Sequence, residues 1–393
     1  MERGDLIELR AERMVAGGDA LARAEDGRVV FVEGALPDEL VRVKLTQVRK
    51  DHCKGAVAQV LAPSTDRVAP ICPHVAAGCG GCSWQHAATS AQGSFKREIV
   101  IDALRRLARI EDPTVLATVE LRATDYRTTL RAAIAKDGTL SLRKRSSHDL
   151  VGIEGCLVAH PLVRDIIDNA RIPGAREATI RVGTGTNERL VIIDGDYSDA
   201  YGPTEGVTLV DIEDRVARYH EMVKGKRMRI SAPSFFQSHV DAPAALVDAG
   251  QAAIGDAPIG RLADLYCGVG LFAAFIDADE TLAVESSRTA TRDAKHNLKD
   301  RNAIVLCNDV DAADLGDCDA IIADPPRDGL GKKGLTAIIN ADPERVVLVS
   351  CDAAAGARDI RALLDVGYKL TSVQPIDQFP HTHHVEIVSG FHR

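Results

Sequence analysis

The sequence lacks any apolar run of the roughly 20 residues that a membrane-spanning helix needs. Its first residues, Met1 to Asp5, carry mixed charge and no apolar stretch of the kind found in secretory signal peptides. It also contains no internal repeat and no low-complexity tract. These absences exclude the membrane and repeat classes, and we expect a cytoplasmic protein that does not bind a membrane.

The composition is that of a folded protein with more than one domain. Of the 393 residues, 45% are hydrophobic and 27% are charged, which is typical of globular chains, and the length predicts about two or three domains. Nine cysteines in a reducing compartment do not indicate a disulfide framework. The net charge of −9 argues only weakly against nucleic acid, because binding depends on local patches. Two such basic patches, which could equally be solvated faces, are Arg42, Lys44, Arg49, Lys50 and Lys54, and Arg127, Arg131, Arg143, Lys144 and Arg145.

Periodicity divides the chain into three parts. Residues 5–62 alternate in the manner of short strands separated by turn residues, which suits a small OB-type barrel used for RNA or for packing. Apolar spacing predicts a helix over 93–110, and the pattern from 126 to about 228 is β-rich again. From 233 onward, strands alternate with helices as in a doubly wound parallel sheet. We therefore expect an α/β + β fold with domains at 1–65, 66–232 and 233–393, and with the 93–110 helix packed on the last domain.

Three cysteines stand close together in the stretch CPHVAAGCGGCSW, as Cys72-x6-Cys79-x2-Cys82. Glycines at 78, 80 and 81 let the backbone wrap closely around a metal, and Cys156 is the nearest candidate for a fourth ligand. Four thiolates suit tetrahedral zinc or a [4Fe–4S] cluster. Zinc sites usually use two paired half-motifs, so the isolated fourth ligand favours iron–sulfur; His74 is the alternative ligand.

The stretch ADLYCGVGLF, residues 263–272, reads as a strand followed by a glycine turn, Gly268-x-Gly270. Such a turn is weak evidence of a nucleotide site when it stands alone. The next strand, TLAVES, ends in Glu285, about twenty residues on, where such folds carry an acid for a ribose. Ala273 replaces the third glycine of a dinucleotide motif, and no Gly-Lys-Ser/Thr of a P-loop follows. These absences favour S-adenosylmethionine, with its adenine near Tyr266 or Glu285.

Further acids and one cysteine close the following strands. Ligands of open α/β sheets bind at the carboxyl ends of strands, so these side chains should meet at one edge. Cysteines are most often buried in the core, which is the alternative for Cys351. Cys351 follows the apolar run of VVLVSCD, however, and its place on the same edge of the sheet favours a nucleophile. Arg327 stands where amine methyltransferases carry an aromatic residue, which argues against N-methylation. The strand-end residues are Asp264, Glu285, Asp309, Asp324 and Cys351.

Together these motifs resemble the bacterial uracil-C5 RNA methyltransferases, which form 5-methyluridine in ribosomal or transfer RNA. The resemblance covers nearly the whole chain: residues 14–45 resemble a TRAM barrel, and SFFQSH, DLYCGVGLF, DPPRDG, VSCD and FPHTHHVE follow in the family's order. It implies Cys351 as nucleophile, Glu386 as general base, and a cofactor site of Gln237, Tyr266, Gly268, Glu285 and Asp324. It also implies Cys72, Cys79, Cys82 and Cys156 as ligands of a [4Fe–4S] cluster.

Three features depart from the family pattern: the first cysteine gap is one residue longer, Asp352 replaces an asparagine, and the segment 271–286 is short. His381, His383 and His384 compete with Glu386 for the role of base. Alternatives are a DNA cytosine-C5 methyltransferase, which would carry its cysteine directly after the Asp324 motif, and a non-catalytic iron–sulfur RNA-binding protein. The TRAM barrel and the cluster favour 23S rRNA over the T-loop uridine of tRNA, and we expect a monomer.

Overall fold

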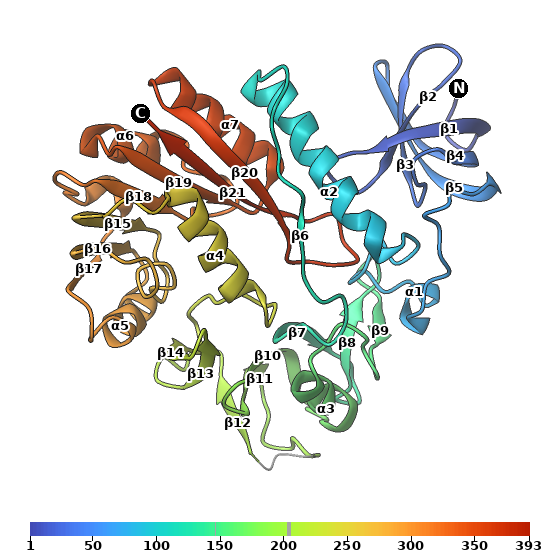
Figure 1. Ribbon diagram of the computed structural model, residues 1–393. Helices are drawn as coiled ribbons and strands as arrows, with labels where there is room; N and C mark the ends of the chain where they lie inside the picture. Colours follow the sequence, from blue (N-terminus) through green and yellow to red (C-terminus); the bar gives the residue numbers. More distant parts are fainter. Residues whose placement is uncertain (146, 203–205) are drawn as a thin grey trace.

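Five strands at the N-terminus close into a barrel with the order β1-β2-β3-β5-β4 (Figure 1, blue). The computed structural model describes residues 1–145, 147–202 and 206–393. Alternate side chains fill the barrel, as Val30, Val32, Val41 and Val43 are fully buried, and closure leaves no free sheet edge. The expected OB-type barrel is therefore confirmed. Its strands are β1 (Leu6–Met14), β2 (Ala20–Arg23), β3 (Val29–Glu33), β4 (Leu40–Val48) and β5 (His52–Ala62).

The middle of the chain forms a six-stranded sheet with the order β12-β11-β10-β7-β8-β9. Helix α3 (Pro161–Asn169) packs Val163, Ile166 and Ile167 into one core with the apolar residues of β7 and β10. The short helix α1 (Pro73–Ala76) precedes this sheet, and the hairpin β13–β14 follows it. The strands are β7 (Thr129–Ile134), β8 (Leu140–Arg143), β9 (Leu150–Gly152), β10 (Ala175–Gly183), β11 (Glu188–Gly195), β12 (Val207–Asp211), β13 (Arg218–Val223) and β14 (Lys226–Ser231).

An eight-stranded sheet with the order β17-β16-β15-β18-β19-β21-β20-β6 forms the C-terminal part (Figure 1). Its first five strands are parallel, whereas β21 runs antiparallel to both of its neighbours. The strands are β15 (Arg261–Leu265), β16 (Glu280–Glu285), β17 (Ala303–Cys307), β18 (Ala320–Ala323), β19 (Arg345–Ser350), β20 (Lys369–Asp377) and β21 (Glu386–His392).

Helices cover both faces of this sheet, which explains why β19 is buried along its whole length. Val346 and Leu348 share a core with α7, whereas Val347 and Val349 share one with α4. A parallel strand therefore reads as a continuous apolar run rather than as an alternating one. The helices are α4 (Ala242–Ile254), α5 (Arg288–Asn297), α6 (Gly331–Ala341) and α7 (Ala353–Asp365), with the short turn η2 (Val310–Ala312).

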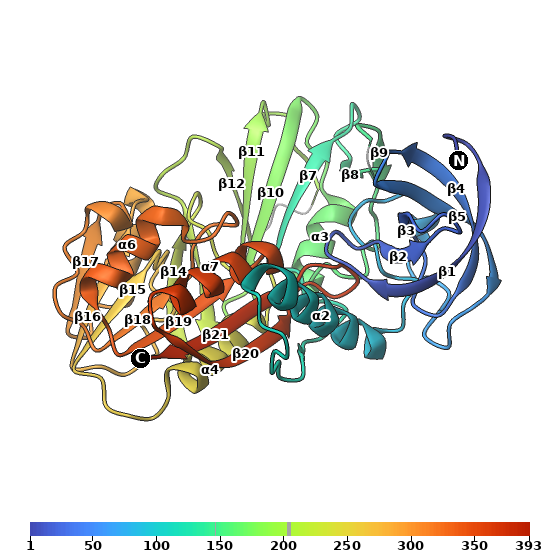
Figure 2. The ribbon, with the colours of Figure 1, turned by 90° about the horizontal axis from the view of Figure 1, so that it is seen from above.

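Helix α2 (Thr89–Ala103) lies between the barrel and the C-terminal sheet in both views (Figures 1 and 2). A π-helical turn, η1 (Leu104–Ala108), continues it and packs against α7, and Arg109 ends it with a φ of 58°. The following strand β6 (Val119–Glu120) pairs with β20, so this early segment belongs to the C-terminal sheet. The domain limits at 65 and 232 stay a prediction.

The connection between β15 and β16, residues 266–279, consists of turns and bends and has no regular helix. Residues 270–276 form turns, and Ile276 donates its N–H to the carbonyl of Phe272 at 2.9 Å as in a single helical turn. The glycine turn is therefore not followed by a helix N-terminus of the usual kind. None of the helices in the described residues has the length and apolar character that a membrane crossing requires.

Candidate active site

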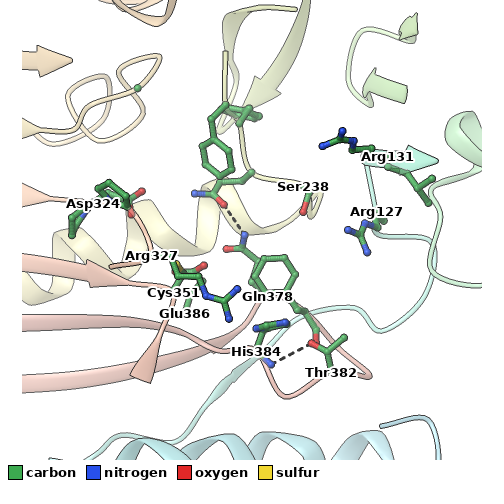
Figure 3. A pocket seen from close by; sticks show the side chains of 18 of the residues that line it. Arg127, Arg131, Ser238, Asp324, Arg327, Cys351, Gln378, Thr382, His384 and Glu386 are labelled. Atoms are coloured by element: carbon green, nitrogen blue, oxygen red, sulfur yellow. Dashed lines mark hydrogen bonds between the residues drawn. The ribbon is translucent and has the colours of Figure 1, made fainter. Parts of the chain in front are cut away.

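A cavity of about 1290 Å³ lies between the middle sheet and the edge of the C-terminal sheet. Figure 3 shows Arg327, Cys351 and Glu386 together, with Arg127 and Arg131 facing them from the middle sheet. The structure brings all seven of the predicted catalytic and cofactor residues to the wall of this cavity. These are Gln237, Tyr266, Gly268, Glu285, Asp324, Cys351 and Glu386.

The convergence follows from strand direction. β15, β16, β18 and β19 are parallel, so their carboxyl ends meet at one edge, where Glu285 ends β16 and Asp324 follows β18. Asp264 lies one layer deeper: it is fully buried and accepts the N–H of Ala273 at 2.9 Å. Burial raises its pKa to about 8, and Asp324 and Glu285 add to this effect. Asp264 therefore braces the glycine turn from below rather than lining the cavity.

Glu285 is bound to the backbone of the glycine turn and to the backbone of the loop that follows its own strand. Its carboxylate accepts the N–H of Gly268 at 3.0 Å and the N–H of Ser287 at 2.6 Å. Tyr266, between the strand end and the turn, has a φ of 59°, which is strained for a residue with a bulky side chain. Such strain is kept where the surrounding structure holds a loop in one shape, here the loop that places Gly268 in the cavity wall.

Cys351 and Glu386 come from opposite ends of neighbouring antiparallel strands. Cys351 follows Ser350, the last residue of β19, and Ser350 pairs with Ile387, the second residue of β21. Because β21 begins where β19 ends, Glu386 starts its strand beside the cysteine. Burial, together with the charges of Glu386 and Asp324, raises the pKa of the Cys351 thiol to about 11. Burial and Asp324 raise the pKa of Glu386 well above its usual range.

Asp352, where the resemblance expects asparagine, caps helix α7. Its Oδ1 accepts the N–H groups of Ala354 at 3.0 Å and Ala355 at 2.9 Å, a role that the oxygen of an asparagine can also fill. What the carboxylate adds is a negative charge 4.0 Å from the guanidinium of Arg327. The charge of Arg327 lowers the pKa of Cys351. Because Asp352 carries the opposite charge, it offsets part of this effect of Arg327 on the thiol.

The three histidines near Glu386 differ in position. The His381 ring is buried, and its Nε2 donates to the carbonyl of Ala123 at 3.1 Å, which makes it part of the core. His383 and His384 line the cavity, but burial lowers the pKa of both, that of His383 to about 4. Neutral histidines at neutral pH can accept a proton, so position rather than charge favours Glu386, which lies beside Cys351.

The four predicted metal ligands line a second, smaller cavity. Cys72, Cys79, Cys82 and Cys156 all contribute to its wall, and all four are free thiols. Burial raises the pKa of Cys82 to about 11, and the neighbouring thiols add to the effect. In the described part of the chain, no group of three or more His, Cys, Asp or Glu side chains that could hold a metal ion is found. Arg127, Leu130 and Leu142 line both cavities, which are therefore adjacent.

Known proteins share both the sequence and the fold. The family described as tRNA (Uracil-5-)-methyltransferase matches residues 274–391, and the TRAM domain matches residues 4–58. An uncharacterized RNA methyltransferase of Streptomyces avermitilis is 32% identical over 423 residues, covering 98% of each chain. One of Streptomyces coelicolor is also 32% identical, over 98% of this chain and 92% of that protein. The chain belongs to the RNA (uracil-5-)-methyltransferase family.

The fold of this methyltransferase also resembles that of a solved enzyme over nearly the whole chain. A Pyrococcus abyssi tRNA (uracil-54, C5)-methyltransferase, solved with S-adenosyl-L-homocysteine, has a TM-score of 0.74 and covers 98% of this chain and 100% of its own. The two are 20% identical, so the comparison bears on the fold. The expected barrel and Rossmann-like C-terminal domain are confirmed, as is the expectation of an S-adenosylmethionine-dependent RNA (uracil-C5) methyltransferase at the level of the family.

Two glutamines in the methyltransferase cavity form a pair. The side-chain amide of Gln378 donates to Oε1 of Gln237 at 2.6 Å, and both residues are buried (Figure 3). Oε1 of Gln378 is buried and has no hydrogen-bond partner among the residues that the structure describes. Gln237 was predicted from its motif, whereas Gln378 carries no sequence signal beyond its position before FPHTHHVE.

The opposite wall of the cavity is basic and aromatic. Arg127 and Arg131 come from the segment around β7, and Phe235 is 68% exposed at the same cavity. Arg131 forms an ion pair with Glu177, which also faces Arg143 at 3.5 Å. The sequence marked these arginines only as a basic patch; their place opposite Cys351 comes from the packing of the two sheets. Phe235 was missed, although an exposed phenylalanine in a polar turn is itself a signal.

Proposed function

We propose that this methyltransferase transfers the methyl group of S-adenosylmethionine to C5 of a uridine in RNA through a covalent adduct between Cys351 and C6. The observation that carries the proposal is the meeting of Cys351 and Glu386 at one edge of a single cavity with the ribose-binding acid Glu285. A nucleophile, a base and a donor site are thus within one chamber.

The chemistry requires a covalent step because C5 of uracil is a poor nucleophile. The Cys351 thiolate adds to C6, and the electron pair of the C5–C6 double bond moves into an enolate with density on C5. The electron pair on C5 then forms the bond to the methyl carbon of S-adenosylmethionine, while the S–CH3 bond breaks and its electrons stay on the sulfur of the departing thioether, S-adenosylhomocysteine. The thiolate is the reactive form, and its pKa of about 11 in the free protein means that a proton must leave before attack. Arg327 favours that loss, because its charge lowers the pKa of the thiol.

After methyl transfer, C5 carries both the methyl group and its original proton. Glu386 takes this proton, the C5–H electrons restore the double bond, and Sγ of Cys351 leaves with the electrons of the C6–S bond. The raised pKa of Glu386 makes it a stronger base once ionised. Reaching a stacked base in folded RNA also requires the uridine to be turned out of its helix.

The cofactor site is assigned to residues around the glycine turn. Glu285 keeps acceptor capacity for a ribose hydroxyl beyond its two backbone bonds, and Gly268 lets the chain approach the ligand closely. Tyr266, Gln237 and Asp324 would hold the rest of the cofactor, which would supply the methyl group. All five contribute to the same cavity wall.

We further propose that Cys72, Cys79, Cys82 and Cys156 bind a [4Fe–4S] cluster. Three thiols from residues 72–82 and a fourth from Cys156 line one cavity, and four cysteine thiolates are the ligand set of a [4Fe–4S] cluster. The cluster would tie residues 72–82 to the loop before α3; no catalytic step passes through it.

The RNA substrate is proposed to be 23S rRNA, acted on by a monomer in the cytoplasm, where that RNA is made and assembled. The second candidate is the T-loop uridine of tRNA, because the Pyrococcus abyssi protein that matches the whole chain is named a tRNA (uracil-54, C5)-methyltransferase. A barrel alone therefore does not separate the two substrates. The basic wall formed by Arg127 and Arg131 suits the phosphates of either RNA.

The test is a methyl-transfer assay with labelled donor on 23S rRNA and tRNA transcripts, followed by mass mapping of nucleosides. We expect 5-methyluridine at a single position in one of the two RNAs. The same mapping in a deletion strain should show loss of that one nucleoside. Label in cytosine, or no label in any RNA despite bound cofactor, would overturn the proposal.

A further inference from the structure

The loop 378–385 joins β20 to β21 and leads directly into Glu386. Three successive carbonyl groups of this loop are bound by donors that come from the segment 84–126, far away in the sequence. Loops of this length usually satisfy such carbonyls with solvent, so the three bonds mark a loop whose path is imposed from outside. The bonds run from Lys96 Nζ to Phe379 O at 2.9 Å, from the Tyr126 hydroxyl to Pro380 O at 3.3 Å, and from Trp84 N–H to His381 O at 2.8 Å.

Lys96 is the charged member of this set. It lies on α2 with no exposed surface, and its ammonium group also forms an ion pair with Asp377, the last residue of β20. Burial lowers the pKa of Lys96 and raises the pKa of Asp377, while the charge of each partner opposes the shift of the other. A buried ion pair is a weak source of stability, because desolvation offsets most of the attraction. The position of the Lys96–Asp377 ion pair is therefore more informative about its role than its contribution to stability.

The ion pair lies next to the pairing that places the base. Ile376 pairs with Glu386 across β20 and β21, and Asp377 directly follows Ile376. Lys96 therefore holds two points, the carboxylate of Asp377 and the carbonyl of Phe379, on the strand end that faces Glu386. Gln92, one turn earlier on α2, accepts the N–H of His381 at 2.7 Å and so binds the middle of the loop.

We propose that Lys96 is a positioning residue for Glu386, and that it acts on the step in which the C5 proton is removed. This inference rests on the proposed function, in which Glu386 is the base. In that step the proton passes from C5 to the Glu386 carboxylate, the double bond re-forms, and the C6–S bond breaks. Attack by Cys351 precedes it and depends on β19 and α7, which Lys96 does not contact through any of its hydrogen bonds.

The experiment compares Lys96→Met with Lys96→Met combined with Asp377→Asn. The double variant leaves no unpaired buried charge, so it keeps the test valid if the single variant does not fold. We expect turnover on 5-methyluridine formation to fall about 10- to 100-fold, the scale of a displaced general base. Covalent capture on RNA containing 5-fluorouridine, which needs Cys351 but no proton removal, should stay within about threefold of wild type.

A second readout is specific to the proton. RNA deuterated at C5 of the target uridine should show a larger isotope effect on turnover in the Lys96 variants than in wild type, together with more methylated adduct at steady state. Arg97→Met is the matched control: Arg97 lies next on α2 and also binds carbonyls, at Val115 and Leu116, but none of the loop. It should leave the turnover and the isotope effect unchanged.

The possible outcomes are distinct. An equal fall in capture and turnover, with an unchanged isotope effect, would make Lys96 a structural residue and overturn the inference. Full turnover in the double variant would do the same. Failure of wild-type protein to form a 5-fluorouridine adduct would instead overturn the proposed function, whatever the Lys96 variants do.

Discussion

The backbone N–H of Gly268 donates to the carboxylate of Glu285 at 3.0 Å and so joins the turn after β15 to the end of β16. The other carboxylate oxygen accepts the N–H of Ser287 at 2.6 Å, and each oxygen keeps a further lone pair for a ligand. A single acid thus shapes the turn, and in the proposed function it also binds the ribose of the cofactor.

Replacing Glu285 with alanine is expected to weaken S-adenosylmethionine binding by roughly 2–3 kcal/mol, the scale of a lost hydrogen bond to a charged group. Calorimetry with the cofactor and with unmethylated RNA provides the measurement. RNA affinity should hardly change. An equal loss of both affinities would mean that Glu285 only shapes the turn through Gly268.

Cys351 and Glu386 should fail at different stages when they are changed. Cys351→Ala removes the nucleophile, so neither methyl transfer nor an adduct can form. Glu386→Gln keeps attack and methylation but has a far weaker base, so a methylated RNA–protein adduct should accumulate as a labelled band on a denaturing gel. A Cys351→Ala protein that still makes 5-methyluridine would falsify the nucleophile assignment; near-normal turnover by Glu386→Gln would move the base to His383 or His384.

The pH dependence of the free enzyme should follow the raised pKa values of its two central groups. Cys351 has a pKa of about 11 and Glu386 is raised well above its usual range, so both lose their protons as the pH rises. Alkylation of Cys351, followed by peptide mass mapping, should therefore keep rising beyond about pH 9, past the usual cysteine midpoint. Asp324→Asn should shift this profile to lower pH because it removes a charge that raises the thiol pKa. A plateau below pH 8 would contradict the buried-thiol description.

Anaerobically purified protein should be brown and contain about four irons per chain, as [4Fe–4S] proteins do. Cys79→Ser should bleach the colour and lower the thermal stability of the middle sheet. Cys53→Ser is the matched control, because Cys53 is buried in the barrel and lines neither cavity. Colourless protein with one bound zinc would exclude the iron–sulfur cluster.

The barrel should add RNA affinity without taking part in the chemistry. Arg42→Ala with Lys44→Ala is expected to weaken RNA binding and to reduce its salt dependence by about one unit of slope, while turnover on a short substrate persists. Arg42 already pairs with Glu8 at 2.7 Å, so Lys44 should contribute the larger part. Arg361→Ala with Lys369→Ala, which changes the charge equally at residues outside the cavity wall, is the control. An equal effect of both pairs would place the RNA surface elsewhere.

The sequence by itself determined the strand-end chemistry of this protein. Gly268, Glu285, Asp324 and Cys351 could be placed on one edge because parallel strands end on the same side of a sheet, whatever the details of packing. The barrel was equally predictable, since alternation over residues 5–62 is a local pattern. The four cysteines could be grouped by spacing and by the motif, both of which are properties of the chain.

Other features depended on contacts between distant segments. The predicted helix at 93–110 begins at Thr89 and ends in a π-helical turn, which packs against α7, and apolar spacing does not reveal such a change of pitch. The crossover after Gly270 has turns where the doubly wound pattern predicts a helix. Neither boundary follows from local propensity.

Only the tertiary structure decided which residues surround Cys351. Glu386 lies beside it because β21 runs antiparallel to β19, a pairing between strands whose order no local pattern encodes. Lys96, on a helix more than two hundred and fifty positions before the loop, reaches Phe379 because α2 packs under the C-terminal sheet. Spacing along the chain therefore predicts which chemical groups lie at the edge of the sheet. Long-range packing determines which of these groups contact one another and which contacts fix the position of each.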